Sequence, residues 1–272
     1  MRAGHAALFL APVSAIIALV FLVPLAQIAY TSLDGAQLSA RAYTELASST
    51  LFSRVLVNTF EISIGSTVIS LLLGYPIAYH LSRVPPRRRA LYMILVLLPF
   101  WTSILVKSFA FTVILGENGI INNLLRTLIG PGAALQMLFN RAGATIGMVH
   151  YLLPFTVFPI LVSLLAQGTD LHKAARVMGA SRARIFFRIT LPLSLPGVLA
   201  GAVMSLVLSL GMFVTPALLG GRRDLMMANL VDFYTRVSLD WGVASAIALL
   251  LLGLTGILIA IMARLPGEHR LI

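Results

Sequence analysis

Residues 169–197, TDLHKAARVMGASRARIFFRITLPLSLPG, interrupt very hydrophobic segments with a dense set of charges. The organisation of the whole chain can be read outward from this interruption. Apolar residues recur at helical spacing both before and after Gly179, which predicts two short helices. Gly179 and Ala180 predict the break between them, since glycine adopts left-handed backbone angles at low cost. Pro192 and Pro196 are expected to end the second helix before the next apolar run.

Capping residues stand at both predicted helix starts. Thr169 or Asp170 is predicted to cap the first helix and Ser181 the second, by accepting hydrogen bonds from unpaired N–H groups. Each helix has an apolar face and a basic face, the latter formed by Lys173, Arg176, Arg182, Arg184 and Arg188. Periodicity alone leaves two interpretations open, a loop resting on anionic lipid and a surface that docks on a protein.

The composition of the whole chain is that of an integral membrane protein. Of its 272 residues, 59% are hydrophobic and 11% are charged, whereas about a quarter of the residues in a soluble domain are charged. The net charge of +11 does not indicate a nucleic-acid partner, because the basic residues are not gathered into one basic domain. The absence of cysteine excludes disulfides, thiolate catalysis and Cys-based metal sites.

Six apolar runs are long enough to cross a membrane, which takes roughly 20 residues each. The first lacks charged residues from Ala6 to Leu33, longer than the apolar region of a signal peptide, and predicts a retained anchor. The spans are expected at about 6–33, 58–82, 90–116, 144–168, 197–220 and 242–264, with a cytoplasmic loop at 169–196. The sequence thus predicts a single all-α transmembrane domain whose termini lie on the same side.

The distribution of Lys and Arg over the loops predicts the orientation. One side carries most of them, namely Arg2, Arg83, Arg87, Arg88, Arg89, Lys173, Arg176, Arg182, Arg184, Arg188, Arg264 and Arg270. Of the nine acidic residues, only Asp170 and Glu268 lie on that side. This side is therefore predicted to be the cytoplasm, which places residues 169–197 and both termini there.

Two of the predicted outer segments have amphipathic character. Residues 34–58 are expected to include a short helix along the membrane surface, and residues 116–141 an interfacial helix or a plug that dips toward the bundle. Residues 224–241 are expected to form an outer loop. Pro99 lies within the third predicted span, where it frees a carbonyl that neighbouring protein or water must satisfy.

Residue patterns typical of enzymes are missing from the sequence. It has no G-x-x-x-x-G-K-[ST] phosphate loop and no H-E-x-x-H, and its five histidines are scattered, so no catalytic residue and no metal ligand is assigned. His150 lies within a predicted span, where a packed histidine and a ligand contact both remain open. If the protein transports a solute, the energy must come from another chain through the 169–197 surface or from an ion gradient. A gradient-driven carrier typically shows an inverted repeat and a midplane charge relay, which this chain lacks.

The 169–197 stretch resembles the EAA loop of ABC-importer permeases. The resemblance rests on Ala174-Ala175, Gly179-Ala180-Ser181, Leu191-Pro192 and Pro196-Gly197. It implies a six-span type I permease bundle whose cytoplasmic coupling helix docks into a cleft of an ATPase subunit. The implied ATPase-coupling residues are Asp170, Lys173, Ala174, Ala175, Met178, Gly179, Ala180, Ser181, Phe186 and Pro192.

Lys173 departs from the family pattern, which has a glutamate at this place. Like charges repel, so we expect an acidic or neutral residue opposite Lys173 on the ATPase, or a lysine turned to solvent or headgroups.

Three further motifs narrow the resemblance. LPFWTS at 98–103, GIIN at 119–122 and FVTPALLGG at 213–221 resemble permeases of spermidine/putrescine-type importers, most of all the permease B type. This implies import of a small polar solute by alternating access across a bacterial inner membrane. The implied partners are an ATPase dimer that binds ATP-Mg, a second similar permease, a periplasmic solute-binding protein and membrane lipid. No cofactor is expected on this chain.

Residues of the types that recognise polyamines lie near the predicted pathway. The candidates are Glu61, Trp101, Lys107, Glu117, Phe213 and Thr215. Carboxylates and aromatic faces attract amines, the latter by about 0.5–2 kcal/mol. Glu61 and Glu117 could instead be interface residues, and Lys107 could repel a polyamine or neutralise one of these glutamates. A gradient-driven carrier and a non-transporting membrane scaffold remain as alternative functions.

Overall fold

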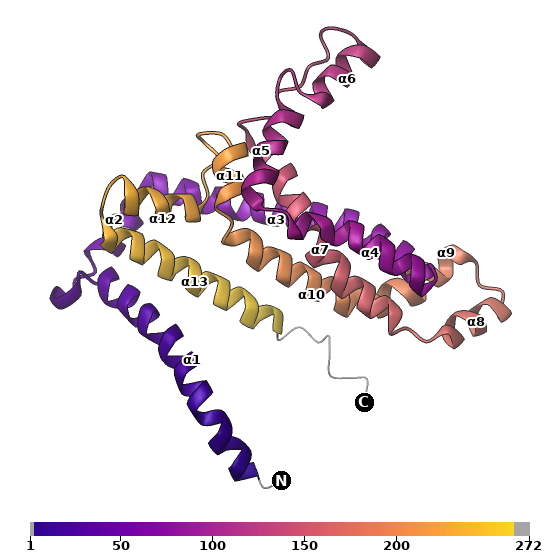
Figure 1. The fold of residues 1–272 in the computed structure, drawn as a ribbon, viewed down its shortest axis with the longest axis horizontal. Coiled ribbons are helices and arrows are strands. Elements are labelled where there is room, and N and C mark those ends of the chain that lie inside the picture. The colour runs from indigo at the N-terminus through magenta and orange to yellow at the C-terminus, as the bar shows by residue number, and fades with distance from the viewer. Residues whose placement is uncertain (1–2, 264–272) are drawn as a thin grey trace. The chain divides into compact units, whose positions relative to one another are not determined.

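The computed structural model describes residues 3–263 and shows a helical protein with no strand in that part of the chain (Figure 1). Six helical segments are long and apolar enough to cross a membrane. They are Ala11–Ser32, Thr50–Arg83, Ile104–Ile129, Arg141–Leu165, Arg182–Leu210 and Trp241–Met262. The predicted all-α membrane fold with six spans is therefore confirmed. The charges at Arg2, Arg264, Glu268 and Arg270 lie outside the described residues.

The chain divides into two units, of which the smaller comprises residues 1–54 and 230–254. It contains α1 (Ala3–Ser32), η1 (Gly35–Gln37), α2 (Arg41–Ser48) and most of α13 (Trp241–Ala263). Arg41 at the start of α2 pairs with Asp34 and Asp240. None of the apolar window of α1 is buried, as expected for a helix that faces lipid or another subunit.

The larger unit, residues 55–229 and 255–272, is built around α7 (Arg141–Leu165). This helix packs along α10 (Leu191–Leu210) and against α3 (Thr50–Arg83). Small residues permit the close approach. A Cβ on Gly197 of α10 would lie 2.5 Å from the Pro159 carbonyl oxygen, and one on Gly74 of α3 would lie 2.5 Å from Thr156 Oγ1.

The run predicted as one span at 90–116 is divided in the structure. It forms α4 (Pro86–Trp101) and α5 (Ile104–Leu115), with extended backbone at Thr102 and Ser103 between them. After α5 the chain enters α6 (Ile120–Ile129), whose Asn122 side chain is bonded to backbone groups of Gly116 and Leu135. Residues 116–141 were expected to contain an interfacial helix or a plug, and α6 is the helix found in this segment.

The 169–197 stretch begins as predicted but continues differently. Helix α8 (Thr169–Val177) is followed by Gly179 at φ +78°, and Ser181 caps α9 (Arg182–Ile185) by accepting from the Arg184 N–H. The predicted cap at Thr169 or Asp170 is wrong, because the N-cap is Gly168 and both residues lie inside the helix.

Pro192 and Pro196 do not end the second helix. Helix α9 passes through a π-helical turn, η2 (Phe186–Thr190), directly into α10. Side chains of α7 and the residues after it supply donors to this segment: Gln167 Nε2 donates to the Thr190 carbonyl (3.0 Å) and Ser163 Oγ to the Leu193 carbonyl (3.3 Å). The helix thus continues through both prolines, with a wider π-helical turn before them and side-chain donors beside them.

Short helices fill the predicted outer segments. The run predicted as one span at 197–220 is divided between the end of α10 and α11 (Val214–Leu219). The expected loop at 224–241 contains α12 (Met227–Arg236), so that expectation missed a helix. The Met227 N–H donates to Thr59 Oγ1 (2.9 Å) and Asn229 Nδ2 to the Phe213 carbonyl (3.0 Å), which holds the start of α12 in place.

Candidate functional site

Helix α8 presents an apolar surface that nothing in the described chain covers. Leu171, Val177 and Met178 are 55%, 89% and 85% exposed. Ala174 is exposed as well, and Ala175 is half-buried beside it. Within the larger unit, α8 and α9 lie at one end of the bundle, away from α6 and α11 (Figure 1). An exposed amphipathic helix at the end of a bundle is suited to docking on another protein.

Lys173 turns toward its own helix. Its Nζ lies 3.1 Å from Asp170 Oδ1, one helical turn earlier, and both side chains are largely exposed. Such an exposed pair contributes little to stability, about 0–1 kcal/mol. The lysine thus lies at the surface of α8, and what it faces on an ATPase stays a prediction.

The π-helical turn after α9 anchors the segment to the membrane helices. The Phe186 ring packs edge to face on Tyr79 (5.3 Å between centroids) and on Tyr75 (5.9 Å) of α3. The Tyr75 hydroxyl shares a hydrogen bond with Ser194 Oγ of α10 (2.9 Å). Phe186, predicted as a coupling residue, therefore contacts this chain's own α3.

Thr190, the last residue of the π-helical turn η2, contacts α8. His172 Nε2 lies 3.1 Å from Thr190 Oγ1, while the Thr190 carbonyl accepts from Gln167. Thr190 itself is buried. The structure thus links the exposed surface of α8 to α7 and α10 through a short chain of hydrogen bonds.

A cluster of polar residues gathers at the opposite end of α3 and α7. Arg141, the first residue of α7, bonds to Glu61, to Asn58 Oδ1 (2.7 Å) and to Asp224 Oδ1 (3.2 Å). Asn58 also donates to the Arg223 carbonyl (2.6 Å). Arg141 is paired with two carboxylates, Glu61 and Asp224, and ties α3, α7 and the 220–226 loop together.

The idea that Lys107 neutralises Glu61 or Glu117 is wrong. Glu61 pairs with Arg141, whereas Lys107 Nζ donates to the Pro99 carbonyl (2.5 Å) and lies over the Tyr151 ring. The sequence did not single out Arg141, Asn58 or Asp224. A lone arginine that opens an apolar run next to predicted outer loops is the signal that could have found the first of them.

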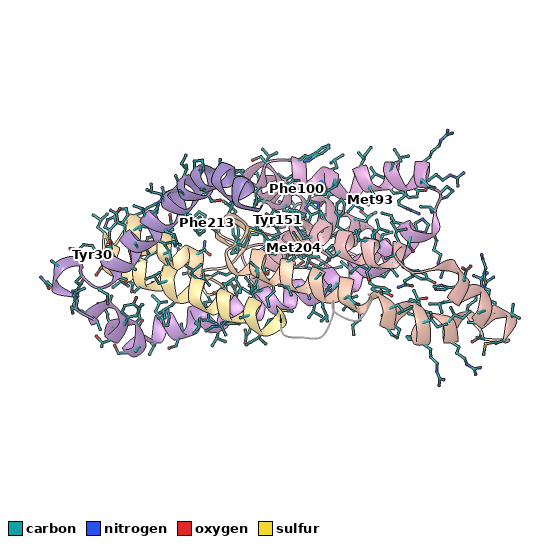
Figure 2. The ribbon with its side chains drawn as sticks, turned by 90° about the horizontal axis from the view of Figure 1, so that it is seen from below. Tyr30, Met93, Phe100, Tyr151, Met204 and Phe213 are labelled. Carbon is teal, nitrogen blue, oxygen red and sulfur yellow. The ribbon has the colours of Figure 1, made fainter. Side chains whose placement is uncertain are left out.

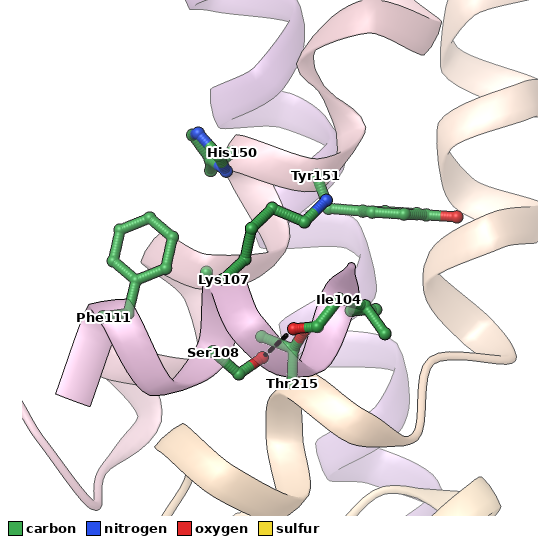
Figure 3. A pocket seen from close by; sticks show the side chains of 8 residues that line it. Ile104, Lys107, Ser108, Phe111, His150, Tyr151 and Thr215 are labelled. Carbon is green, nitrogen blue, oxygen red and sulfur yellow. Dashed lines mark hydrogen bonds between the residues drawn. The ribbon is translucent and has the colours of Figure 1, made fainter. Parts of the chain in front are cut away.

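Lys107 and Thr215 line one cavity of the larger unit (Figure 3). The other lining residues are Ile104, Ser108, Phe111, Gly147, His150 and Tyr151. His150 packs edge to face on Phe111, with ring centroids 5.1 Å apart. The cavity volume is about 10 Å³, room for one water molecule at most, so no solute fits there in this conformation.

The other predicted pathway residues are not gathered with these two. Trp101, at the end of α4, is 75% exposed, Phe213 is 37% exposed, and Glu117 lies exposed just after α5. Figure 2 shows Phe100 and Tyr151 near the middle of the larger unit, where Phe155 contacts both rings. Among the described residues, the structure brings together Lys107 and Thr215 but assembles no complete solute site from the six candidates.

Residues 66–266 match the family of binding-protein-dependent transport system inner membrane components. The chain belongs to this family. The spermidine/putrescine transport system permease protein PotB of Haemophilus influenzae is 36% identical over 214 residues, which cover 79% of this chain and 75% of that protein. PotB of Escherichia coli K12 is 31% identical over 79% of this chain and 78% of its own length.

A solved structure has the same fold. A chain in the crystal structure of a bacterial alginate ABC transporter in complex with an alginate pentasaccharide-bound periplasmic protein superposes with a TM-score of 0.78. The alignment covers 96% of this chain and 95% of that chain at 19% identity. The predicted fold, a six-span ABC-importer permease bundle, is thereby confirmed.

These similarities establish the kind of protein. It is an inner-membrane permease of an ABC importer, and its matched relatives are permease subunits rather than enzymes. The EAA-type resemblance predicted from residues 169–197 agrees with this family membership.

Proposed function

We propose that this permease imports a polyamine of the spermidine/putrescine class. The observation that carries the proposal is the 36% identity with a spermidine/putrescine permease over three quarters or more of both chains. The residue chemistry supports it. Glu117 offers an exposed carboxylate at the predicted outer end, and the exposed Trp101 ring offers an aromatic face that attracts amines.

We further propose that α8 is the surface through which ATP hydrolysis drives this chain. Leu171, Ala174 and Met178 would contact a groove on a separate ATPase subunit, which holds ATP-Mg. Gly179, Ala180 and Ser181 would set the angle between α8 and α9. A movement of α8 would reach the membrane helices through Phe186 and Pro192, because η2 and α10 continue directly from α9. The other members of this proposed coupling set are Asp170, Lys173 and Ala175.

The complete machine in this proposal has several chains. Two ATPase subunits, a second similar permease and a periplasmic solute-binding protein accompany this permease in the lipid bilayer. Both termini would lie in the cytoplasm with α8. The largely exposed α1 supports contact with lipid or with another subunit.

Reconstitution in proteoliposomes tests the substrate and the energy source together. The complex should take up labelled putrescine or spermidine only with internal ATP and external binding protein, and the loaded binding protein should stimulate its ATPase activity. Uptake by this chain alone would identify a gradient-driven carrier. Uptake of a different solute with no polyamine uptake would overturn the substrate class.

A substitution on α8 tests the docking surface. Met178→Glu places a charge on an apolar contact and should abolish stimulated ATPase activity, whereas Met178→Leu should retain it. Full transport by Met178→Glu would exclude this docking role.

A further inference from the structure

Lys107 of α5 lies beside Tyr151 (Figure 3) and contacts two uncharged groups. Its Nζ donates a 2.5 Å hydrogen bond to the Pro99 carbonyl oxygen and lies 5.3 Å from the centre of the Tyr151 ring. None of the ion pairs formed between described residues includes Lys107. The half-buried ammonium is therefore satisfied without a carboxylate.

The Pro99 carbonyl is free to accept a hydrogen bond from an ammonium group because it lies at the C-terminal end of α4. Helix α4 ends at Trp101, so Pro99 has one of the last carbonyls, which lack partners within the helix. The negative end of the helix dipole adds to its attraction for a positive charge. Thr102 Oγ1 donates to the same oxygen at 3.1 Å, so the break between α4 and α5 positions both donors.

A carbonyl oxygen combined with an aromatic face is a general arrangement for binding alkylammonium ions. The end of a lysine side chain is such an ion, an ammonium on four methylene groups, and putrescine carries the same group at each end. We propose that the Pro99 carbonyl and the Tyr151 ring form an alkylammonium subsite, which Lys107 occupies in this conformation. A terminal amine of the transported polyamine takes the place of Lys107 during passage; this second step rests on the proposed function.

The surroundings of the subsite are suited to transient binding. The adjoining cavity is lined by Phe111, His150 and Thr215 and has a volume of only about 10 Å³ while the lysine side chain is in place. Withdrawal of Lys107 adds the volume of its own side chain to that space. Without a carboxylate the subsite binds amines weakly, which a transport pathway needs so that the solute can leave.

Chemical complementation tests the subsite independently of transport. The Lys107→Ala importer complex, in lipid nanodiscs, is titrated with n-butylammonium chloride while its apparent Tm is measured. The Tm of the variant should rise by about 3 °C once n-butylammonium is well above its dissociation constant, and equal concentrations of 1-butanol or sodium chloride should give no such rise. The wild type, whose subsite is filled, and Lys173→Ala, which loses the exposed lysine of α8, should not respond.

Further variants make each outcome decisive. Lys107→Ser also leaves the space open to a ligand and replaces Lys107→Ala if the alanine variant does not assemble. A second substitution, Tyr151→Leu, in the Lys107→Ala complex should abolish the rise in Tm with n-butylammonium. No rise in Tm in either Lys107 variant, or an equal rise in the wild type, would overturn the subsite.

Putrescine in the same titration examines the substrate step. It should raise the Tm of the Lys107→Ala complex as butylammonium does, and absence of that rise would overturn the substrate step. If butylammonium binds but the wild-type importer transports no polyamine, the proposed function fails and the subsite stands. If polyamines are transported but no amine stabilises the variants, the subsite fails and the function stands.

Discussion

Phe186 packs edge to face on Tyr79, with ring centroids 5.3 Å apart and ring planes at 84°. The contact joins the π-helical turn after α9 to α3, and Tyr75 meets the same phenylalanine from one turn earlier on α3. A motion that begins on the exposed surface of α8 therefore meets a rigid aromatic contact within about two helical turns of chain.

Removal of the contact between Phe186 and Tyr79 should weaken the attachment of η2 to α3. Phe186→Ala is expected to destabilise the permease by about 1–3 kcal/mol, less than a fully buried phenylalanine because Phe186 is half-buried. The measurement is the apparent Tm of the complex, together with the ratio of transport to ATP hydrolysed. A double-mutant cycle with Tyr79→Leu should show a coupling energy of about 0.5–1.5 kcal/mol. Additive effects would show that the two rings do not act together.

Loss of Arg141 should leave two carboxylates without their shared cation. Arg141→Gln is expected to cost about 1–2 kcal/mol, because hydrogen bonds to charged groups exceed neutral ones while partial exposure weakens the ion pairs. The difference in Tm from the wild type should shrink at high salt, which screens the exposed charges. Adding Glu61→Gln to Arg141→Gln should recover part of the loss. A double variant no more stable than the single one would contradict the role of the ion pair.

Gly179 and Gly168 form a matched pair of glycines that flank α8. Neither would place a Cβ within 4 Å of other atoms, but Gly179 has φ +78° and Gly168 has φ −62°. Gly179→Ala should therefore cost about 1–2 kcal/mol through backbone strain alone, and Gly168→Ala should be nearly neutral. Binding-protein-stimulated ATPase activity should fall in the first variant only. Equal behaviour of the two would mean that the turn geometry is unimportant.

The contact between α7 and α10 depends on Gly197. A methyl group there would lie 2.5 Å from the Pro159 carbonyl oxygen and from Ser163 Cβ, so the two helices must separate to accept it. Gly197→Ala should lower the apparent Tm by several degrees, since overpacking costs about 1–3 kcal/mol. Gly256→Ala on α13, where no atom lies within 4 Å of the added methyl, serves as the control and should not lower the Tm.

Features that depend on a few neighbouring residues could be predicted from the sequence. The number of spans follows from the length of apolar runs, and the Ser181 cap and the Gly179 turn follow from local backbone chemistry. The exposed surface of α8 also follows from periodicity, because an apolar face beside a basic face needs a partner. In each case the physical cause lies in residues that are close together in the sequence.

Features that depend on distant residues could not be predicted. Pro192 and Pro196 lie within a continuous helix, which Gln167 and Ser163 contact from the α7 side at the carbonyls of Thr190 and Leu193. Arg141 finds its partners about 80 residues away along the chain, and Lys107 is satisfied by a carbonyl that becomes available only where α4 ends. These contacts determine how the residues of the candidate site are arranged. The sequence shows which residues are present but not which of them pair.

The continuity of α9, η2 and α10 also sets a length scale. The helical segment Arg182–Leu210 has 29 residues, a rod of about 40 Å at about 1.5 Å per residue. Pivoting such a rod by about 10° at one end would sweep its far end through about 7 Å. That far end leads through Gly211 to Thr215, which lines a cavity now only large enough for one water molecule. Under the proposed function, a small tilt at the Ser181 cap would thus become a displacement of several ångströms beside this cavity.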